Sequence, residues 1–276
     1  MKNIIIKSGL GLFIILFTAC NLDYDPVSQL SERTLGTKDT TGTEIKYKDR
    51  EAIQAVYKSM YQRMTGQQEH WYLDYLLFAE CRSDNAYAGT TGAEVVPVET
   101  NNLDASNSVI ARDWNRYLED IALANSIISN IDLVPDQTLT GAERNQWKAE
   151  AKIFRAMMMY DMARWFGNFP VITREAGKIT AENIKDVYPL YFPKANTPAE
   201  AYAQIISDLR SSLEFAPANN NADKSILSKT VARALLTKVY ADRIVQNPDS
   251  VIYFANQVAA DGITLVGNYS DLFGLN

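Results

Sequence analysis

The spacing of apolar residues constrains the fold of this sequence more than any other feature, because they recur every three or four positions along most of the chain. In residues 49–64, for example, Ile53, Val56, Tyr57 and Met60 follow this spacing. Residues spaced in this way lie on one face of an α-helix, which can pack against neighbouring helices. The other segments with helical spacing are 114–131, 147–165, 202–213, 232–240 and 252–260. The sequence therefore predicts an all-α fold of about six or seven helices.

Polar capping residues mark where several of these helices begin. Thr140 precedes Glu143 by three positions and Thr197 precedes Glu200 by three, so each pair can form a capping box between side chains and backbone amides. Further predicted boundaries are helix starts at Ser228 and Asp249 and a helix end at Gly167 and Pro170.

We expect the predicted helices to form stacked hairpins. Helix pairs with Ala and Tyr at internal positions are typical of tetratricopeptide-like repeats, although the consensus spacing is met only loosely. Residues 71–79 (WYLDYLLFA) predict a buried helix, with a strand as the alternative. Residues 82–108 show no such spacing, and residues 168–196 form a second long connection, so the sequence predicts two long irregular loops.

Residues 1–19 have the composition of a secretory signal peptide. Lys2 and Lys7 supply positive charge, residues 9–17 (GLGLFIILF) are apolar, and Ala19 is a small residue suited to a cleavage site. This apolar stretch is too short to span about 30 Å of hydrocarbon as a helix. The sequence therefore predicts export and removal of the leader.

Cys20 follows the leader directly, in a sequence (LFTAC) that resembles the lipid-attachment box of bacterial lipoproteins, except that Phe17 replaces the usual Leu. Acyl chains on Cys20 would contribute about 0.8 kcal/mol per buried CH₂ group to membrane binding. The alternative is a free N-terminal thiol in a secreted protein. We therefore expect residues 20–48 to be a lipid-anchored tether and irregular edge, and residues 49–276 to be the helical-repeat domain.

Charge and composition exclude several classes of protein. The chain has 27 Lys and Arg against 33 Asp and Glu, a net charge of −6. Because the leader holds two Lys and no acid, the mature chain has 25 − 33 = −8, and no basic run suits nucleic acid phosphates. Apolar residues at 47% and charged residues at 22% are ordinary for a globular protein, which excludes a disordered scaffold.

Histidine and cysteine are too scarce for the usual zinc clusters or catalytic pairs. His70 is the sole histidine, and Cys81 is the sole cysteine after Cys20. A Ser-His or Cys-His pair would need His70, which lies in a predicted polar turn (GQQEHW). Glu80 and Asp84 are the only closely spaced carboxylates near aromatic residues along the sequence. We therefore expect no enzyme, no metal site and no cofactor.

Several motifs occur in a fixed order along the chain. Residues 114–125 read W-x2-Y-x3-I-x2-A-N, residues 150–160 read E-A-K-I-F-R-A-x3-Y, and residues 164–170 read R-W-F-G-N-F-P. The further motifs are Leu22, Asp23 and Pro26 after Cys20, then Thr197-Pro198-x-Glu200-x-Tyr202, Ala232-x-Ala234-Leu235-Leu236-x3-Tyr240 and Tyr269-x-Asp271-Leu272-Phe273. From Cys20 onward, this succession resembles the SusD/RagB family of outer-membrane nutrient-binding lipoproteins of Bacteroidota.

The resemblance implies a function in nutrient uptake at the cell surface. Such proteins bind a nutrient, usually an oligosaccharide, and deliver it to a SusC-like TonB-dependent transporter in the outer membrane, without covalent chemistry. The chain corresponds to the N-terminal half of these proteins, which implies an incomplete SusD-like fold, apparently truncated before the C-terminal half.

Sugars are bound by aromatic rings that stack on C–H faces and by amides, carboxylates and arginines that bind hydroxyl groups. Residues 71–87 contain both kinds of side chain. The candidate ligand-binding residues are Trp71, Tyr72, Arg82, Asp84, Asn85 and Tyr87. For the first two the alternative is core packing, and for Arg82, Asp84 and Asn85 it is a capped turn.

A second hypothesis is a helical-repeat adaptor, RagB-like or an orphan half, that binds peptide or protein on a concave face. A sugar binder should have exposed aromatic rings beside polar groups, whereas a peptide binder should have a long apolar or charged groove. The motif residues themselves predict structural roles. We expect Asn125 to be a hydrogen-bonded core residue, and Glu150 and Arg155 to have separate local partners.

Overall fold

The computed structural model describes residues 45–66, 69–83, 85–89, 94–175, 177–220 and 223–273. The predicted signal peptide, Cys20, most of the predicted tether and Asp84 lie outside the described residues. Contacts divide the chain into units 1–46 and 47–276, and every element below belongs to the second. Within the described residues there is no β-strand, and the predicted all-α class is confirmed. No described helix is both long enough and apolar enough to cross a membrane.

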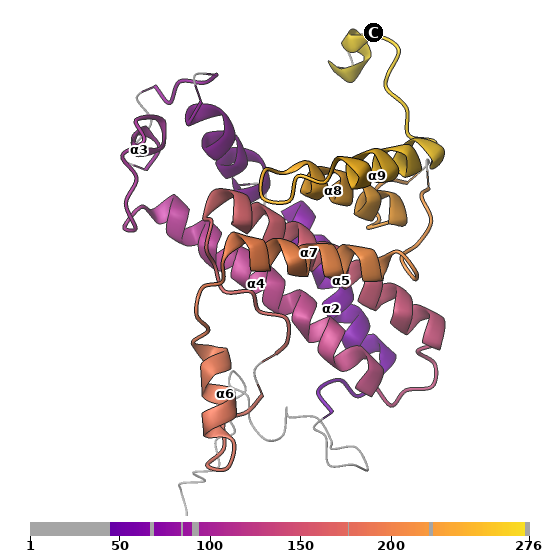
Figure 1. Cartoon of the computed structure of the whole chain (residues 1–276). Helices are drawn as coiled ribbons and strands as arrows, with labels where there is room; N and C mark the ends of the chain where they lie inside the picture. Colours follow the sequence, from indigo (N-terminus) through magenta and orange to yellow (C-terminus); the bar gives the residue numbers. More distant parts are fainter. Residues whose placement is uncertain are drawn as a thin grey trace, which may run out of the picture. The chain divides into compact units, whose positions relative to one another are not determined.

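The helices of this unit follow one another with short and long connections (Figure 1). They are α2 (Arg50–Gly66), α3 (Val96–Glu99), α4 (Ser108–Asn130), α5 (Gly141–Trp165), α6 (Ile184–Tyr191), α7 (Pro198–Ser212), α8 (Lys229–Ala241) and α9 (Pro248–Ala260). Two π-helical segments, η1 (Glu69–Asp74) and η2 (Leu77–Cys81), precede α3, while the 3-10 helices are η3 (Ile131–Leu133) and η4 (Tyr269–Phe273).

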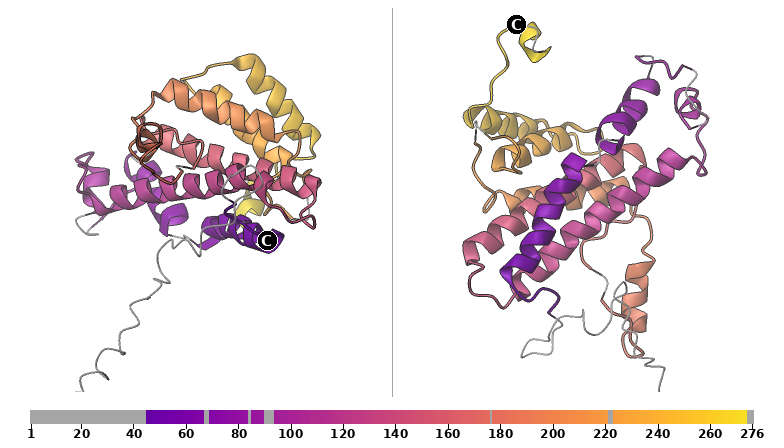
Figure 2. Two further views of the ribbon diagram at one scale, coloured as in Figure 1. Left: turned by 90° about the horizontal axis from the view of Figure 1, so that it is seen from below. Right: turned by 180° about the vertical axis from the view of Figure 1, so that it is seen from behind.

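Helix α5 lies at the centre of the helical packing. It contacts α2, α4, α7 and α8, and α8 pairs with α9. Views from the front and from behind show α5 beside α4 (Figures 1 and 2). Nearly every residue from Ile153 to Ala163 is buried, as expected of a helix surrounded by other helices. Fully buried apolar partners come from the neighbouring helices: Ile53, Met60, Tyr117, Ile121, Ile205, Leu209 and Leu236.

Both predicted capping boxes are confirmed. The Glu143 amide donates to the Thr140 hydroxyl at 3.2 Å, and the Glu200 amide donates to the Thr197 hydroxyl at 3.3 Å. Each glutamate accepts in return from the threonine amide. Hydrogen bonds from Arg50 and then from Thr140 lower the pKa of Glu143 to about 2. Glu143 therefore stays ionised at neutral pH, and its negative charge interacts favourably with the positive end of the α5 helix dipole.

Other helix boundaries agree with the prediction in part. Ser228 caps α8, and Gly167 ends α5 with a φ of 73°, a conformation that glycine adopts without strain. The predicted start of the last helix at Asp249 is wrong by a short distance. Asn247 is the cap, because its side chain accepts a hydrogen bond from the Ser250 amide at 3.0 Å.

One guanidinium holds the connection between α4 and α5. Arg144 donates to the carbonyls of Leu139 at 3.2 Å, Val134 at 2.8 Å and Asp136 at 3.0 Å, and also to that of Ile131. Four carbonyls that follow α4 are thereby bonded to one side chain in the first turn of α5. The angle and spacing between these two helices are consequently fixed by a residue near their junction.

A buried ion pair joins α5 to α7. Arg155 donates to both carboxylate oxygens of Asp208 at 2.8 and 2.6 Å. It also donates to Asn125 Oδ1 at 2.6 Å and to the Thr173 carbonyl at 2.8 Å. The Asn125 amide donates to the Ile172 carbonyl at 2.9 Å, so its predicted role as a hydrogen-bonded core residue is confirmed.

Glu150 binds a different set of residues from Arg155, as predicted. It accepts from the Tyr57 hydroxyl at 2.7 Å, from the Tyr61 hydroxyl, and from the Gln146 amide at 2.9 Å. These bonds join α2 to α5. The five-residue separation between Glu150 and Arg155 places them on different sides of α5, where each meets its own neighbours.

The two predicted loops are wrong in part, because each contains a helix. The short α3 lies within 82–108, and α6 lies within 168–196. The second connection begins and ends at one point, where the Asn196 amide donates to the Phe169 carbonyl at 2.9 Å. Helix α6 was missed because its residues bury nothing, so its apolar spacing does not mark a core face.

Candidate functional site

The predicted site segment begins with two π-helical pieces and continues into a hydrogen-bonded turn. The Ser83 hydroxyl donates to the Glu80 carbonyl at 2.9 Å, and the Asn85 amide donates to Ser83 Oγ at 3.3 Å. The Asn85 side chain also donates to the Glu80 carboxylate at 3.0 Å. These contacts agree with the capped turn foreseen as the alternative for this stretch, and they hold Asn85 at the surface.

Aromatic residues of the segment differ in exposure. Tyr72 is 72% exposed and Tyr87 is 79% exposed. Trp71 is partly buried, donates through Nε1 to the Arg63 carbonyl at 3.0 Å, and lies edge-on to His70 with ring centroids 4.7 Å apart. Packing therefore accounts for Trp71, whereas the two tyrosines present ring surface to solvent.

The far end of the segment is joined to α3. Arg82 Nε donates to Asn101 Oδ1 at 3.4 Å, and the Ala88 amide donates to the Glu99 carboxylate at 2.8 Å. Next to α3 lies a polar pocket of about 300 Å³, lined by Glu94, Pro97, Asn102, Asp104, Ser106, Asn107 and Ser108. Carboxylate, amide and hydroxyl groups of this kind can exchange hydrogen bonds with a polyhydroxylated ligand.

One carboxylate of this polar pocket is held ionised. The hydroxyl and then the amide of Ser106 donate to Asp104, which lowers the pKa of that carboxyl. An ionised carboxylate accepts hydrogen bonds that are stronger than those to a neutral group. Asp104 is therefore suited to accept a hydrogen bond from a ligand hydroxyl at neutral pH.

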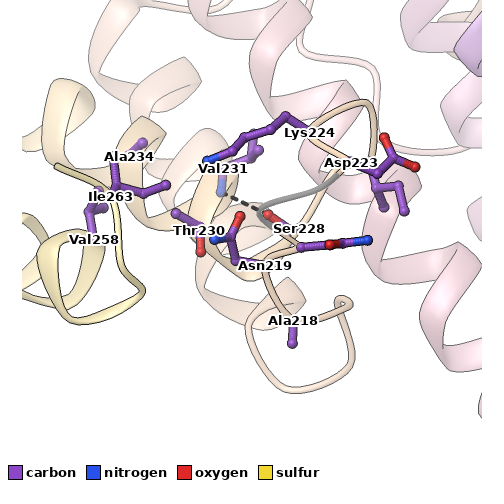
Figure 3. Close-up of a pocket in the computed structure, with 12 residues that line it drawn as sticks. Ala218, Asn219, Asp223, Lys224, Ser228, Thr230, Val231, Ala234, Val258 and Ile263 are labelled. Carbon is purple, nitrogen blue, oxygen red and sulfur yellow. Dashed lines mark hydrogen bonds between the residues drawn. The ribbon is translucent and has the colours of Figure 1, made fainter. Parts of the chain in front are cut away.

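A second pocket, of about 210 Å³, lies at α8 and the connection before it (Figure 3). Val231, Ala234, Val258 and Ile263 give it an apolar lining, and Asn219, Asp223 and Lys224 stand among the polar lining residues. None of its described lining residues is aromatic. Because it offers no ring on which a sugar could stack, it fits a glycan less well than the segment around Tyr87.

Helix α6 carries a second group of exposed aromatic residues, which sequence reasoning missed. Tyr188, Tyr191 and Phe192 are all exposed, and the rings of Tyr188 and Phe192 lie 4.8 Å apart. The Tyr191 hydroxyl donates to the Gly177 carbonyl at 3.2 Å. The signal in the sequence was the spacing of Ile184, Tyr188 and Tyr191, which places them on one helical face.

Sequence reasoning also missed a buried polar cluster, formed by His70, Asp74 and Asp113 and called here the His70 cluster. His70 was expected in a polar turn, and this is wrong: it lies in η1, is completely buried and packs edge-on against Tyr117 at 4.6 Å. Its Nδ1 lies 2.9 Å from Asp113 Oδ1, while Arg112 donates to Asp74 Oδ2 at 2.6 Å.

The electrostatics of the cluster follow from its burial. Burial raises the pKa of Asp74 to about 6, the hydrogen bond from Arg112 opposes this shift, and the Asp113 carboxyl adds to it. The sequence points to Glu80 and Asp84 as carboxylates that lie close together along the chain, whereas the structure brings together Asp74 and Asp113, 39 positions apart, beside Tyr117. The sequence did carry a sign of this cluster. Asp113 lies on the same face of α4 as Tyr117 and Asp120, a face that is buried although it includes acidic residues.

Comparisons with known proteins show to which family the chain belongs. A family model for SusD-like proteins, described as starch-binding and associating with outer membrane, matches residues 34–241. A curated SusD-like protein of Bacteroides ovatus is 25% identical over an alignment of 277 residues, gaps included. The alignment covers 94% of this chain and 45% of the relative. The chain therefore spans less than half the length of that relative.

Solved structures share the fold at lower identity. A SusD superfamily protein of Bacteroides vulgatus is 18% identical with a TM-score of 0.66, over 80% of this chain and 45% of that one. A laminarin-binding SusD-like protein is 20% identical with a TM-score of 0.62, over 83% of this chain and 49% of that one. Because the family model matches well over half of the chain, and the helical fold matches solved relatives, the protein belongs to the SusD-like family.

Proposed function

We propose that this protein binds an oligosaccharide at the cell surface and delivers it to a SusC-like TonB-dependent transporter, without catalysing a reaction. The observation that carries the proposal is the exposure of Tyr72 and Tyr87 in a segment that also offers Arg82 and Asn85. Family membership supports the ligand class, since the family model is described as starch-binding and one structural relative is a laminarin-binding protein.

Tyr87 is the ring best suited to stack on a sugar. It lies in the turn that follows η2, and the neighbouring Ala88 amide is bonded to Glu99 of α3. This anchorage holds the backbone beside the ring while most of the side chain stays in solvent. A ring with an open face and a fixed backbone loses little conformational entropy when a ligand stacks on it.

Polar groups on both sides of Tyr87 supply partners for sugar hydroxyls. Arg82 and Asn85 precede it, and the polar pocket beside α3 adds Asp104 and Asn102. Asp84, which lies outside the described residues, remains part of the proposed site. Arg82 has three guanidinium nitrogens, and its bond to Asn101 uses only Nε, so its terminal nitrogens are suited to a ligand.

The proposed attachment to the outer membrane is through acyl chains on Cys20. The family description, which includes association with the outer membrane, supports this location. Replacing Cys20 by Ser should move the protein from the membrane fraction to the soluble fraction of cells. Unchanged fractionation of this variant would contradict lipid attachment at Cys20.

Calorimetric titration of the mature chain with maltooligosaccharides and laminarin oligosaccharides tests the binding proposal. Tyr87→Ala, Arg82→Ala and Asn85→Ala should each weaken binding by about 1 to 3 kcal/mol, or roughly 5- to 150-fold. Thermal melts should stay nearly unchanged, because these side chains are exposed. Tyr253→Ala is the matched control, since this tyrosine is 59% exposed but lies on α9.

Two results would contradict this site. If the three variants bind as tightly as the unchanged chain, the glycan is bound elsewhere. If Tyr253→Ala weakens binding equally, the loss is not specific to the segment. Trp71→Ala separates packing from stacking, because loss of a packed indole should lower stability by about 3 to 5 kcal/mol, whereas loss of a stacking surface would leave the melt unchanged.

A peptide-binding or protein-binding adaptor is the second candidate, and the α6 surface favours it. This helix buries none of its residues and exposes Ile184, Tyr188 and Tyr191 together. Aromatic residues on an exposed helical face are common anchors in protein interfaces. Tyr188→Ala should then abolish binding of a peptide ligand, with no effect on oligosaccharides.

A further inference from the structure

The His70 cluster brings together three buried side chains of the kinds that bind metal ions, from two parts of the chain. His70 and Asp74 lie one turn apart in η1, and Asp113 lies near the start of α4. All three side chains are completely buried. One donor atom of each lies within 4.8 Å of the donor atoms of the other two.

The hydrogen bonds among the described residues do not satisfy this cluster. While both carboxyl groups are ionised, Asp74 Oδ1, Asp113 Oδ2 and His70 Nε2 have no hydrogen-bond partner among the residues that the structure describes. Native proteins rarely leave buried polar atoms unsatisfied, and burying two neighbouring carboxylates is costly even though Arg112 supplies a positive charge beside Asp74. The unsatisfied oxygens therefore point to a positively charged ligand between the three side chains.

We propose that His70, Asp74 and Asp113 bind a divalent transition-metal ion of the Zn²⁺ type. An imidazole nitrogen favours transition metals, whereas Ca²⁺ takes about six to eight oxygen ligands and Mg²⁺ prefers oxygen donors and water. Three protein ligands with a water molecule in the fourth position form a tetrahedral zinc site, the arrangement known from catalytic zinc. The expectation of no metal site rested on the scarcity of histidine and cysteine, and this proposal departs from it because two of the three ligands are carboxylates.

The donor spacing is compatible with this ion. Bonds of about 2.0 to 2.2 Å in a tetrahedral site place ligand atoms roughly 3.3 to 3.6 Å apart. His70 Nδ1 and Asp113 Oδ1 are already 2.9 Å apart, and the widest separation in the cluster is below 4.8 Å. A shift of about 1 Å that separates His70 Nδ1 from Asp113 Oδ1 and brings Asp74 closer to both would complete the geometry.

A second layer of contacts is already present. Arg112 donates to Asp74 Oδ2 at 2.6 Å, which fixes the orientation of this carboxylate. The His70 ring is held edge-on between Trp71 at 4.7 Å and Tyr117 at 4.6 Å. Such outer contacts orient metal ligands, and their loss typically weakens metal affinity about 10- to 100-fold. Because the site is buried, the ion would join η1 to α4 as a structural element, independently of the proposed glycan binding.

The test uses the untagged mature chain, because an affinity tag would add histidines. The protein is unfolded with a chelator, then refolded with one equivalent of Zn²⁺ or Co²⁺ and desalted, since a buried site fills most readily during folding. We expect about one ion per chain by elemental analysis, visible Co²⁺ absorption bands, and a higher melting temperature. Refolding with Ca²⁺ or Mg²⁺ should leave no bound ion.

Variants distinguish the metal site from an ordinary buried polar network. Asp113→Asn and His70→Gln should each weaken Co²⁺ binding at least tenfold. Asp120→Asn is the matched control: Asp120 is also completely buried on α4, two turns further along, and is bonded to Arg63 at 2.5 Å rather than to the cluster. It should lower stability and retain the ion.

Three results would overturn the proposal. The first is that the refolded wild-type chain holds no Zn²⁺ or Co²⁺, in which case the two carboxyl groups share a proton instead. The second is that Asp113→Asn binds as much ion as the wild type. The third is that Asp120→Asn loses the ion to the same extent. If His70→Gln does not refold, Arg112→Lys replaces it, with an expected 10- to 100-fold weaker affinity.

Discussion

Replacing Asp208 by Asn removes the negative charge that faces Arg155 and preserves the size of the side chain. Arg155 then keeps its bonds to Asn125 and Thr173, but its buried guanidinium has lost its counter-charge. The side chains of the pair are each only 4% exposed, so water cannot compensate. Breaking a buried ion pair in this way costs about 3 to 5 kcal/mol.

This cost is a large part of the total stability of a domain, which is commonly about 5 to 15 kcal/mol. At about 2 to 4 °C per kcal/mol for a domain of this size, the melting temperature should fall by roughly 10 °C. Urea unfolding followed by far-UV circular dichroism measures the free energy directly. Lys148 and Asp132 form an ion pair with Asp132 58% exposed, so Asp132→Asn is the surface control, with an expected loss below about 1 kcal/mol.

Combining Arg155→Met with Asp208→Leu distinguishes the energy of the ion pair from the energy of the other contacts that each residue makes. The double variant should lose less free energy of unfolding than the two single variants lose in total, by more than about 1 kcal/mol, because it leaves no unpaired charge. It should still be less stable than the wild type, since Asn125 Oδ1 and the Thr173 carbonyl lose their donor. If Asp208→Asn lowers the free energy of unfolding by less than 1 kcal/mol, this reasoning is refuted.

Two further predictions concern α7 and α5. Thr197→Ala should lower the free energy of unfolding by about 1 kcal/mol, because the Glu200 amide loses its cap; an unchanged urea midpoint would contradict this. Burial raises the pKa of Asp161 to about 6, against the opposing effect of Arg164 and Lys238. Because this value exceeds the unfolded value of about 3.9, the folded state binds the extra proton between about pH 4 and 6. The wild type should therefore lose on the order of 3 kcal/mol relative to Asp161→Asn as pH rises through this window, measured by urea unfolding at each pH; equal slopes would contradict the assignment.

Elements that bury an apolar face could be predicted from the sequence, and those that do not could not. Capping boxes at Thr140 and Thr197 are local patterns of four residues, so their geometry needs no tertiary information. Helix α6 also has apolar residues at helical spacing, but none of its residues is buried against another element. Sequence spacing reports which residues share a face, and it does not report whether another element covers that face.

The candidate sites show the same limit. Tyr72 and Tyr87 could be chosen from the sequence as aromatic residues near polar ones, and their exposure came only from the structure. The His70 cluster could not be predicted, because His70 and Asp113 are 43 positions apart and meet only when η1 packs on α4. An acidic residue on the apolar stripe of α4 was the one sequence sign of a buried partner.

The bonding of Arg144 to four carbonyls has a consequence for where the chain tolerates a change of length. One residue inserted between Ile131 and Asp136 would move at least one carbonyl out of reach of the guanidinium, and would weaken the junction between α4 and α5. The connection that carries α6 has the opposite property, since its ends meet at Phe169 and Asn196 while its helix buries nothing. Insertions and deletions among relatives should therefore accumulate around α6, and an epitope or fluorescent label placed there would leave the helical packing intact.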